Sequence, residues 1–228
     1  MTGSRFYSLF MSGELVVTVV FLEAFGISVL LLMLPFFTIP RNTRKFYFPQ
    51  VLYFLSVGAG FIFVELFFIK EYVFVFGDPV ISLTVVLAGI LFFSGLGGYW
   101  SKRMRPKNLP YALAALISVL IFMCFAVNPI LVRIQGFSTI LRYPLSLLLL
   151  IPPGFLMGLP FPLGMQHLLN LPSQRAYAWT ANGCASVLAS VASAQIALSF
   201  GISEILIGAI PAYFLALFIG QFKIIRYK

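Results

Sequence analysis

The chain has 228 residues, of which 61% are apolar and only 9% are charged. Soluble domains are on average about 45–50% apolar and about 25% charged, so this composition excludes an ordinary soluble domain. The net charge of +9 does not indicate nucleic-acid binding, because the basic residues stand in short segments between long apolar runs.

Seven apolar runs are long enough to cross a bilayer as helices, which takes about 20 residues each. In chain order they span 14–38, 50–70, 79–100, 110–132, 143–166, 176–200 and 203–222. Asp78-Pro79 and Ser203-Glu204 have the residue types that begin helices. We therefore predict an all-α fold, a polytopic membrane helix bundle of about seven transmembrane helices, as a single integral membrane domain over 1–228.

Lysine and arginine are distributed unevenly over the alternate loops, which predicts the orientation in the membrane. The N-terminus is expected outside and the C-terminus in the cytoplasm of a bacterial inner (plasma) membrane. We expect the first run to be retained rather than cleaved as a signal peptide, because it is too long and Glu23 interrupts it. The basic residues of the predicted cytoplasmic side are Arg41, Arg44, Lys45, Lys102, Arg103, Arg105, Lys107, Arg175, Lys223, Arg226 and Lys228, against Arg5, Lys70, Arg133 and Arg142 on the other side.

Two carboxylates lie inside predicted spans, Glu23 in the first and Glu65 in the second. An ionisable side chain is costly in lipid and usually faces the bundle interior, a partner or a water-filled cavity. One interpretation is a cation site or proton relay that both acids share at similar depth. The other is that each carboxyl is protonated or hydrogen-bonded and stabilises helix packing.

The fifth run contains IPPGFLMGLPFPLG at 151–164 and cannot form a regular helix throughout, because each proline removes a backbone donor. Irregular backbone in a membrane must be buried in protein or line a cavity. The segment is typical of a transporter site, and a purely structural kink is the alternative. The residues that predict the break are Pro152, Pro153, Gly158, Pro160 and Pro162.

The sixth run carries a stripe of small residues at four-residue spacing, which allows a neighbouring helix to approach closely. Asn182 lies in the same run and is a candidate to bridge helices or to contact a ligand. The residues of the small stripe are Ala181, Ala185, Ala189, Ser193 and Ala197.

The motifs of soluble enzyme chemistry do not occur in the sequence, neither a P-loop nor HExxH nor GxSxG. His167 is the only histidine, and no Cys/His cluster is present. We therefore expect no metal, no cofactor and no enzymatic activity in this chain.

Four ordered stretches resemble a known family. They are YFLSVGAGF at 53–61, FGDP at 76–79 with SGLG at 94–97, GLPFPLGM at 158–165, and AWTANGCASVL at 178–188. Over roughly 50–220 the chain resembles the C-terminal membrane region of bacterial spermidine synthase-like integral membrane proteins of the fused transporter/spermidine synthase type. The sequence contains no counterpart of the synthase domain, so the resemblance concerns the membrane part only.

We expect a non-catalytic integral membrane protein that acts as a membrane anchor or as a subunit of a larger assembly, with the lipid bilayer and protein partners or further copies around it. The first alternative is a transport or binding module for a small cation or metabolite such as a polyamine, with Glu23, Glu65 and Asn182 as candidate ligand-binding residues. The second alternative is a membrane subunit of a quinone or electron-transfer complex.

Overall fold

The computed structural model describes residues 3–38, 48–169 and 172–226. These residues form seven helices that are long and apolar enough to cross a membrane, so the prediction of a polytopic helical bundle is confirmed. The fifth span consists of two helices, α5 and α6. The elements are α1 (Gly3–Thr38), α2 (Phe48–Phe76), α3 (Pro79–Ser101), the short 3₁₀ helix η2 (Pro106–Asn108), α4 (Leu109–Gln135), α5 (Thr139–Met157), α6 (Pro160–Leu168), α7 (Pro172–Ser199) and α8 (Ser203–Arg226).

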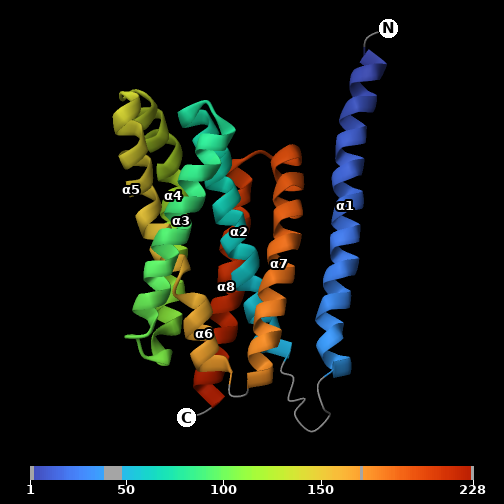
Figure 1. The fold of residues 1–228 in the computed structure, drawn as a ribbon, viewed down its shortest axis with the longest axis vertical. Helices are drawn as coiled ribbons and strands as arrows, with labels where there is room; N and C mark the ends of the chain where they lie inside the picture. The colour runs from blue at the N-terminus through green and yellow to red at the C-terminus, as the bar shows by residue number, and fades with distance from the viewer. Residues whose placement is uncertain (1–2, 39–47, 170–171, 227–228) are drawn as a thin grey trace.

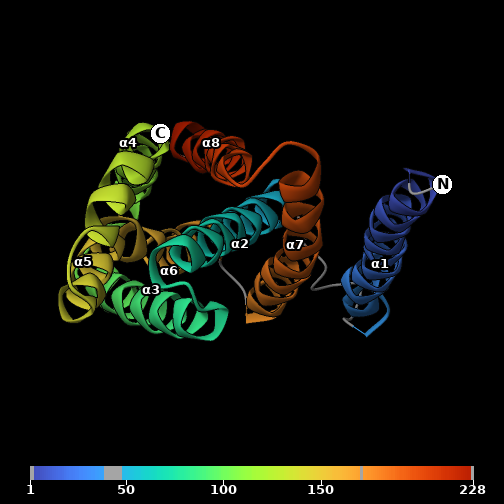
Figure 2. The same cartoon turned by 90° about the horizontal axis from the view of Figure 1, so that it is seen from above.

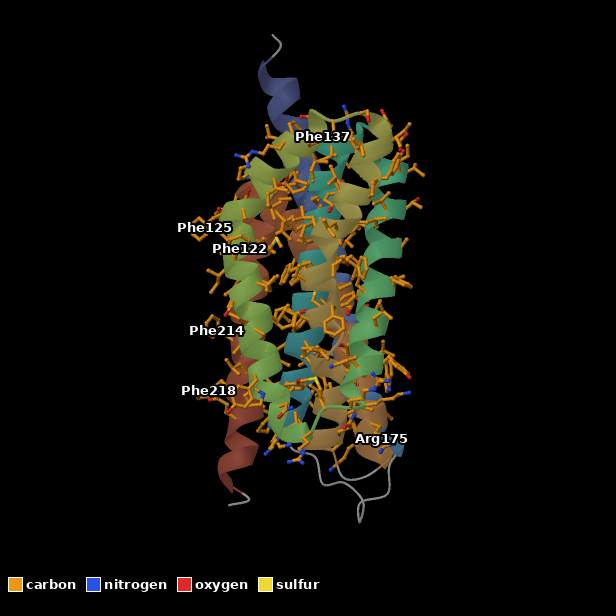
Figure 3. The ribbon with its side chains drawn as sticks, turned by 90° about the vertical axis from the view of Figure 1, so that its left-hand side faces the viewer. Phe122, Phe125, Phe137, Arg175, Phe214 and Phe218 are labelled. Atoms are coloured by element: carbon orange, nitrogen blue, oxygen red, sulfur yellow. The ribbon has the colours of Figure 1, made fainter. Side chains whose placement is uncertain are left out.

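The spans run alternately up and down, so every second connection lies at the same end of the bundle (Figure 1). The connection from α3 to α4 and the C-terminal end of α8 lie together at one end of the bundle, the lower end in Figure 1, and Arg175 near the start of α7 lies there too (Figure 3). Lys102, Arg103 and Lys107 are exposed there. Arg41, Arg44 and Lys45 lie outside the described residues. Among the described residues this end is the more basic of the two, since Lys70, Arg133 and Arg142 lie toward the other end, and we call it the basic end.

The second helix is the centre of the bundle, with α3, α7 and α8 packed around it (Figure 2). Its side chains Tyr53, Phe54, Phe68 and Tyr72 are completely buried or nearly so. The outer surface is apolar as well, because Phe122 and Phe125 on α4 and Phe214 and Phe218 on α8 point away from the bundle (Figure 3). Such a surface suits lipid contact.

The first helix lies at the edge and packs mainly against α7, which separates it from α2 (Figures 1 and 2). Only 6% of its candidate span is buried, the lowest share among the seven. Its contact with α7 includes the Cys184 thiol, 3.7 Å from the carbonyl oxygen of Ser28.

The third and fifth spans approach each other backbone to backbone. A Cβ atom at Gly97 of α3 would collide with the carbonyl oxygen of Phe155, and one at Gly158 would collide with the carbonyl oxygen of Ser94. Small residues permit such close approach of membrane helices. The end of α5 therefore lies directly against α3.

Candidate functional site

A cavity of about 770 Å³ opens among α2, α3, the α5–α6 break and α7. Its walls are mostly apolar and include Val57, Phe61, Leu91 and Met157. A small number of polar or amphipathic side chains also face it. These are Ser94, Gln166, Arg175, Trp179, Asn182 and Ser186.

The broken fifth span forms one wall of this cavity. Helix α5 ends at Met157 and α6 begins at Pro160, so the interruption is confined to Gly158 and Leu159. Gly158 and Pro162 line the cavity. Pro162 has no N–H to donate to the carbonyl of Gly158, as an ordinary helical residue there would.

The other three predicted residues of the break lie elsewhere. Pro152 and Pro153 remain inside α5, the first exposed and the second buried, so the irregular backbone is shorter than the proline run suggests. Pro160 is buried at the start of α6, and its carbonyl accepts a hydrogen bond of 2.7 Å from the Tyr53 hydroxyl. Tyr53 thereby connects the break to the central helix.

Four cavity residues come from one face of α7. Arg175, Trp179, Asn182 and Ser186 follow one another at intervals of four, three and four residues. Side chains at this spacing point in the same direction from a helix. Of these four, Asn182 alone is predicted from the sequence as a candidate for ligand contact, because the spacing shows that the other three share its face but not that this face borders the cavity.

The polar groups on this face have few protein partners. The side-chain amide of Asn182 and the guanidinium of Arg175 form no hydrogen bond or ion pair within the described part of the chain. Asn182 is held closely against α2, because a Cβ at Gly58 would lie 2.5 Å from its backbone oxygen and 2.9 Å from Oδ1. The ring of Trp179 packs on Phe161 with 4.6 Å between centroids.

The predicted small-residue stripe lies beside this face. Ala181, Ala185, Ala189 and Ser193 are buried, and Ala197 is half-buried. Helices α2 and α7 pack against each other more extensively than any other pair of elements, as expected for an interface of small side chains.

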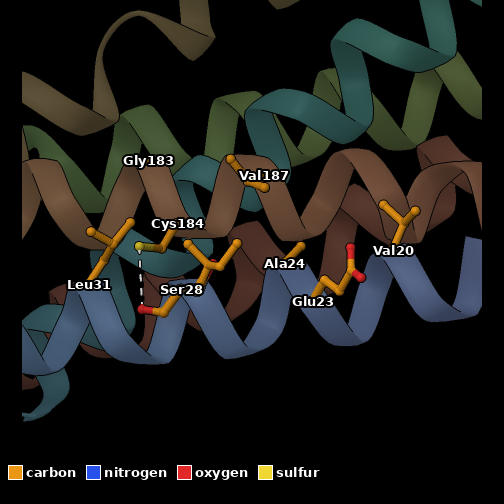
Figure 4. A pocket seen from close by; sticks show the side chains of 9 residues that line it. Val20, Glu23, Ala24, Ser28, Leu31, Gly183, Cys184 and Val187 are labelled. Carbon is orange, nitrogen blue, oxygen red and sulfur yellow. Dashed lines mark hydrogen bonds between the residues drawn. The ribbon is translucent and has the colours of Figure 1, made fainter.

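The two predicted acidic residues do not meet. Glu65 is 8% exposed on α2, and Glu23 is exposed on α1, on the other side of α7. Glu23 borders a separate cavity of about 300 Å³ between α1 and α7, together with Ser28 and Cys184 (Figure 4). The described residues contain no cluster of three or more His, Cys, Asp or Glu side chains. The structure therefore brings Asn182 and the broken span together, and leaves both acids outside that site.

Comparison with family models, with curated proteins and with solved structures finds no match. The resemblance to spermidine synthase-like membrane proteins stays a prediction.

Proposed function

We propose that this chain is a membrane-embedded binding module that holds a small molecule in the cavity among α2, α3, α5–α6 and α7. The observation that carries the proposal is the cavity itself. Its volume of about 770 Å³ is in the range of small-molecule sites, which are commonly about 300–1,000 Å³. Such sites combine apolar walls with a few polar groups that orient the ligand.

The unpartnered polar groups support the same proposal. Asn182 lies seven residues inside α7 from Arg175, which is about 10 Å along a helix. A polar group at membrane depth is costly without a hydrogen-bond partner. A ligand with acceptor atoms would supply partners for the amide of Asn182, the indole N–H of Trp179 and the guanidinium of Arg175.

The lining favours a neutral or anionic ligand over the polyamine that the resemblance suggests. Among the described residues that form the wall there is no Asp or Glu, whereas Arg175 contributes a positive charge. A polyamine would meet a like charge and no carboxylate. The chain is proposed to bind its ligand without performing chemistry on it.

The test is to fill the cavity. Gly95 lines the wall, and a Cβ atom there would meet nothing within 4 Å, so Gly95→Leu places a side chain in the cavity without a backbone collision. Gly26→Leu is the matched control, since Gly26 is exposed on α1 and is equally unobstructed. Mass spectrometry of each variant, purified in mild detergent, should find a retained small molecule with wild type and Gly26→Leu only. Equal retention by Gly95→Leu would contradict the proposal.

A subunit or anchor role in a larger assembly is the second candidate, and the exposed position of α1 favours it. Most of this helix is covered by no other part of the described chain, and its side chains Leu15, Leu22 and Leu30 are at least 60% exposed. A neighbouring membrane protein would bury this surface. Purification in mild detergent should then recover a stoichiometric protein partner, and recovery of the chain alone would argue against the candidate.

A further inference from the structure

The cavity carries positive charge at one end only. Arg175 is exposed and unpaired within the described chain, and it lies at the basic end of the bundle (Figure 3). It is in the first turn of α7, which begins at Pro172. The N-terminal end of a helix carries a partial positive charge, so side chain and helix both favour an anion here.

Two other cations at this end, Lys102 and Arg103, lie over aromatic rings. Lys102 lies over the ring of Tyr99 at 5.5 Å, and Arg103 lies over the rings of Tyr99 and Trp100 at 5.6 and 5.1 Å. Neither lines the cavity. Within the described wall, Arg175 is the charged group that a ligand would meet.

Away from Arg175 the cavity has no further charged side chain and extends along α7 toward the middle of the bundle. Ser186 lies eleven residues further along α7, about 16 Å deeper in a regular helix. Phe61 of α2 and Leu91 of α3 line the wall. The site is thus long, with a charged end at the basic end of the bundle and an interior that is mostly apolar apart from Ser94, Asn182 and Ser186.

The cavity also opens sideways. Leu91 on α3 is 60% exposed and Trp179 on α7 is 62% exposed, and both border it. From above, α3 and α7 flank one side of α2, and the outer side between them is not covered by another helix (Figure 2). A molecule dissolved in the bilayer can therefore reach the site without crossing an aqueous phase.

We infer that the ligand is an anionic amphiphile, a membrane lipid with a phosphate head group, which enters between α3 and α7. Its phosphate pairs with Arg175, and its hydrocarbon chain follows the wall past Phe61 and Leu91. This inference rests on the proposed binding function and adds the class of ligand. A soluble phosphate compound shares the head-group chemistry but lacks the chain that the apolar interior would hold.

The experiment uses Trp179 as a reporter at the site. The chain has two tryptophans, so Trp100→Phe leaves Trp179 as the only one. In vesicles, quenching by brominated phosphatidylglycerol is compared with quenching by brominated phosphatidylcholine, which has no net charge. We expect phosphatidylglycerol to be preferred roughly tenfold at low salt, the factor that one charge-assisted hydrogen bond supplies.

Arg175→Gln should abolish this preference, and Arg105→Gln should retain it, because Arg105 is exposed at the same end but does not line the cavity. An unchanged preference in Arg175→Gln overturns the anionic assignment.

If Gly95→Leu still lowers quenching by both lipids in that case, the binding function stands. If Gly95→Leu also has no effect, the binding function is overturned with it. Relief of the quenching by soluble glycerol phosphate at millimolar concentration overturns the lipid as source and leaves a soluble phosphate ligand.

Discussion

At the scale of single residues, the closest backbone contacts depend on side chains being absent. Gly97 and Gly98 are neighbours on α3, and only the first faces the backbone of α5 at collision distance. A Cβ at Gly98 would lie 3.6 Å from the Gly158 oxygen, an ordinary contact. Alanine substitutions at the two glycines therefore form a matched pair, one with a backbone collision and one without.

We predict that Gly97→Ala lowers the free energy of unfolding by about 1–3 kcal/mol, the usual cost of overpacking. Gly98→Ala should be neutral or slightly stabilising, because alanine has less conformational entropy to lose than glycine. Denaturant titration in detergent measures both. Equal stability of the two variants would show that α3 and α5 do not approach as described.

A second residue-scale prediction concerns two tyrosines that are both completely buried. The Tyr53 hydroxyl donates to the carbonyl of Pro160 at 2.7 Å, whereas the Tyr213 hydroxyl has no partner within the described residues. Tyr53→Phe should destabilise the protein by about 0.5–1.5 kcal/mol, because it removes a buried hydrogen bond to the carbonyl at the start of α6. Tyr213→Phe should cost less than about 1 kcal/mol. Denaturant titration in detergent measures both variants. A larger loss of stability in Tyr213→Phe than in Tyr53→Phe would contradict this reasoning.

Glu65 is predicted to have a structural role. It lies two turns after Gly58 and so on the face of α2 that packs on α7, while Glu23 is beyond α7. Glu65→Gln keeps the shape and hydrogen-bonding capacity, so the variant should fold and respond to added spermidine or Mg²⁺ as wild type does. Thermal unfolding checks this, with the exposed Glu204→Gln as control. Loss of cation-dependent stabilisation in Glu65→Gln, but not in Glu204→Gln, would instead support a cation site at Glu65.

Part of the candidate site was predictable from sequence at this scale. Asn182 and the proline-rich break stand out, because a polar residue and irregular backbone are both unusual in apolar runs. Arg175 and Ser186 did not stand out, because the first was counted as a loop residue and serine is common in membrane helices. Their importance depends on which face of α7 borders the cavity, and that is a property of packing.

At the scale of elements, some helix boundaries agree closely with the expected spans and others do not, as α1 begins at Gly3 rather than at residue 14. The third run was expected over 79–100 and α3 spans Pro79–Ser101, with Asp78 Oδ1 accepting from the amides of Val80 and Ile81 at its start. The second run was expected to end at residue 70, before Glu71. Helix α2 continues to Phe76, because Tyr72 and Val75 are buried against neighbouring helices. Charged residues near a span end do not mark the end when the other helical faces are packed.

The contact between α1 and α7 gives a prediction for these elements. Ser28 and Cys184 are both buried at this contact, and the Cys184 sulfur is 3.7 Å from the backbone carbonyl oxygen of Ser28. Ser28→Cys, in a chain without Cys124, should therefore form a disulfide with Cys184 under mild oxidation. Gly26→Cys is the control, since Gly26 is exposed. If the chain is cut in the segment between α1 and α7, the disulfide would keep the two fragments together, which gel electrophoresis shows as a change in mobility. Absence of a bond in Ser28→Cys, or equal cross-linking in both, would contradict the placement of α1.

At the scale of the whole molecule, composition and charge predict a seven-span bundle but not its arrangement. Every apolar run has apolar residues on all sides, so periodicity does not reveal which face is buried. The central place of α2 reflects close contacts that only three dimensions show, such as Gly58 with Asn182 and Gly60 with the ring of Tyr213. The cavity arises from that arrangement and from the break at Gly158, and its lining comes from four separate spans.

The basic end of the bundle predicts its orientation in the membrane. The structure places η2, which contains Lys107, and the short connection that contains Ser138 at opposite ends (Figure 1). Both residues are exposed, and Lys107 lies at the basic end. Basic loops are retained in the cytoplasm, so this end should face inward. In a chain whose two native cysteines are replaced by alanine, a membrane-impermeant thiol reagent should label Ser138→Cys in intact cells. It should label Lys107→Cys only after the membrane is opened. The reverse pattern would invert the topology and would place Arg175 and the charged end of the cavity on the outer side.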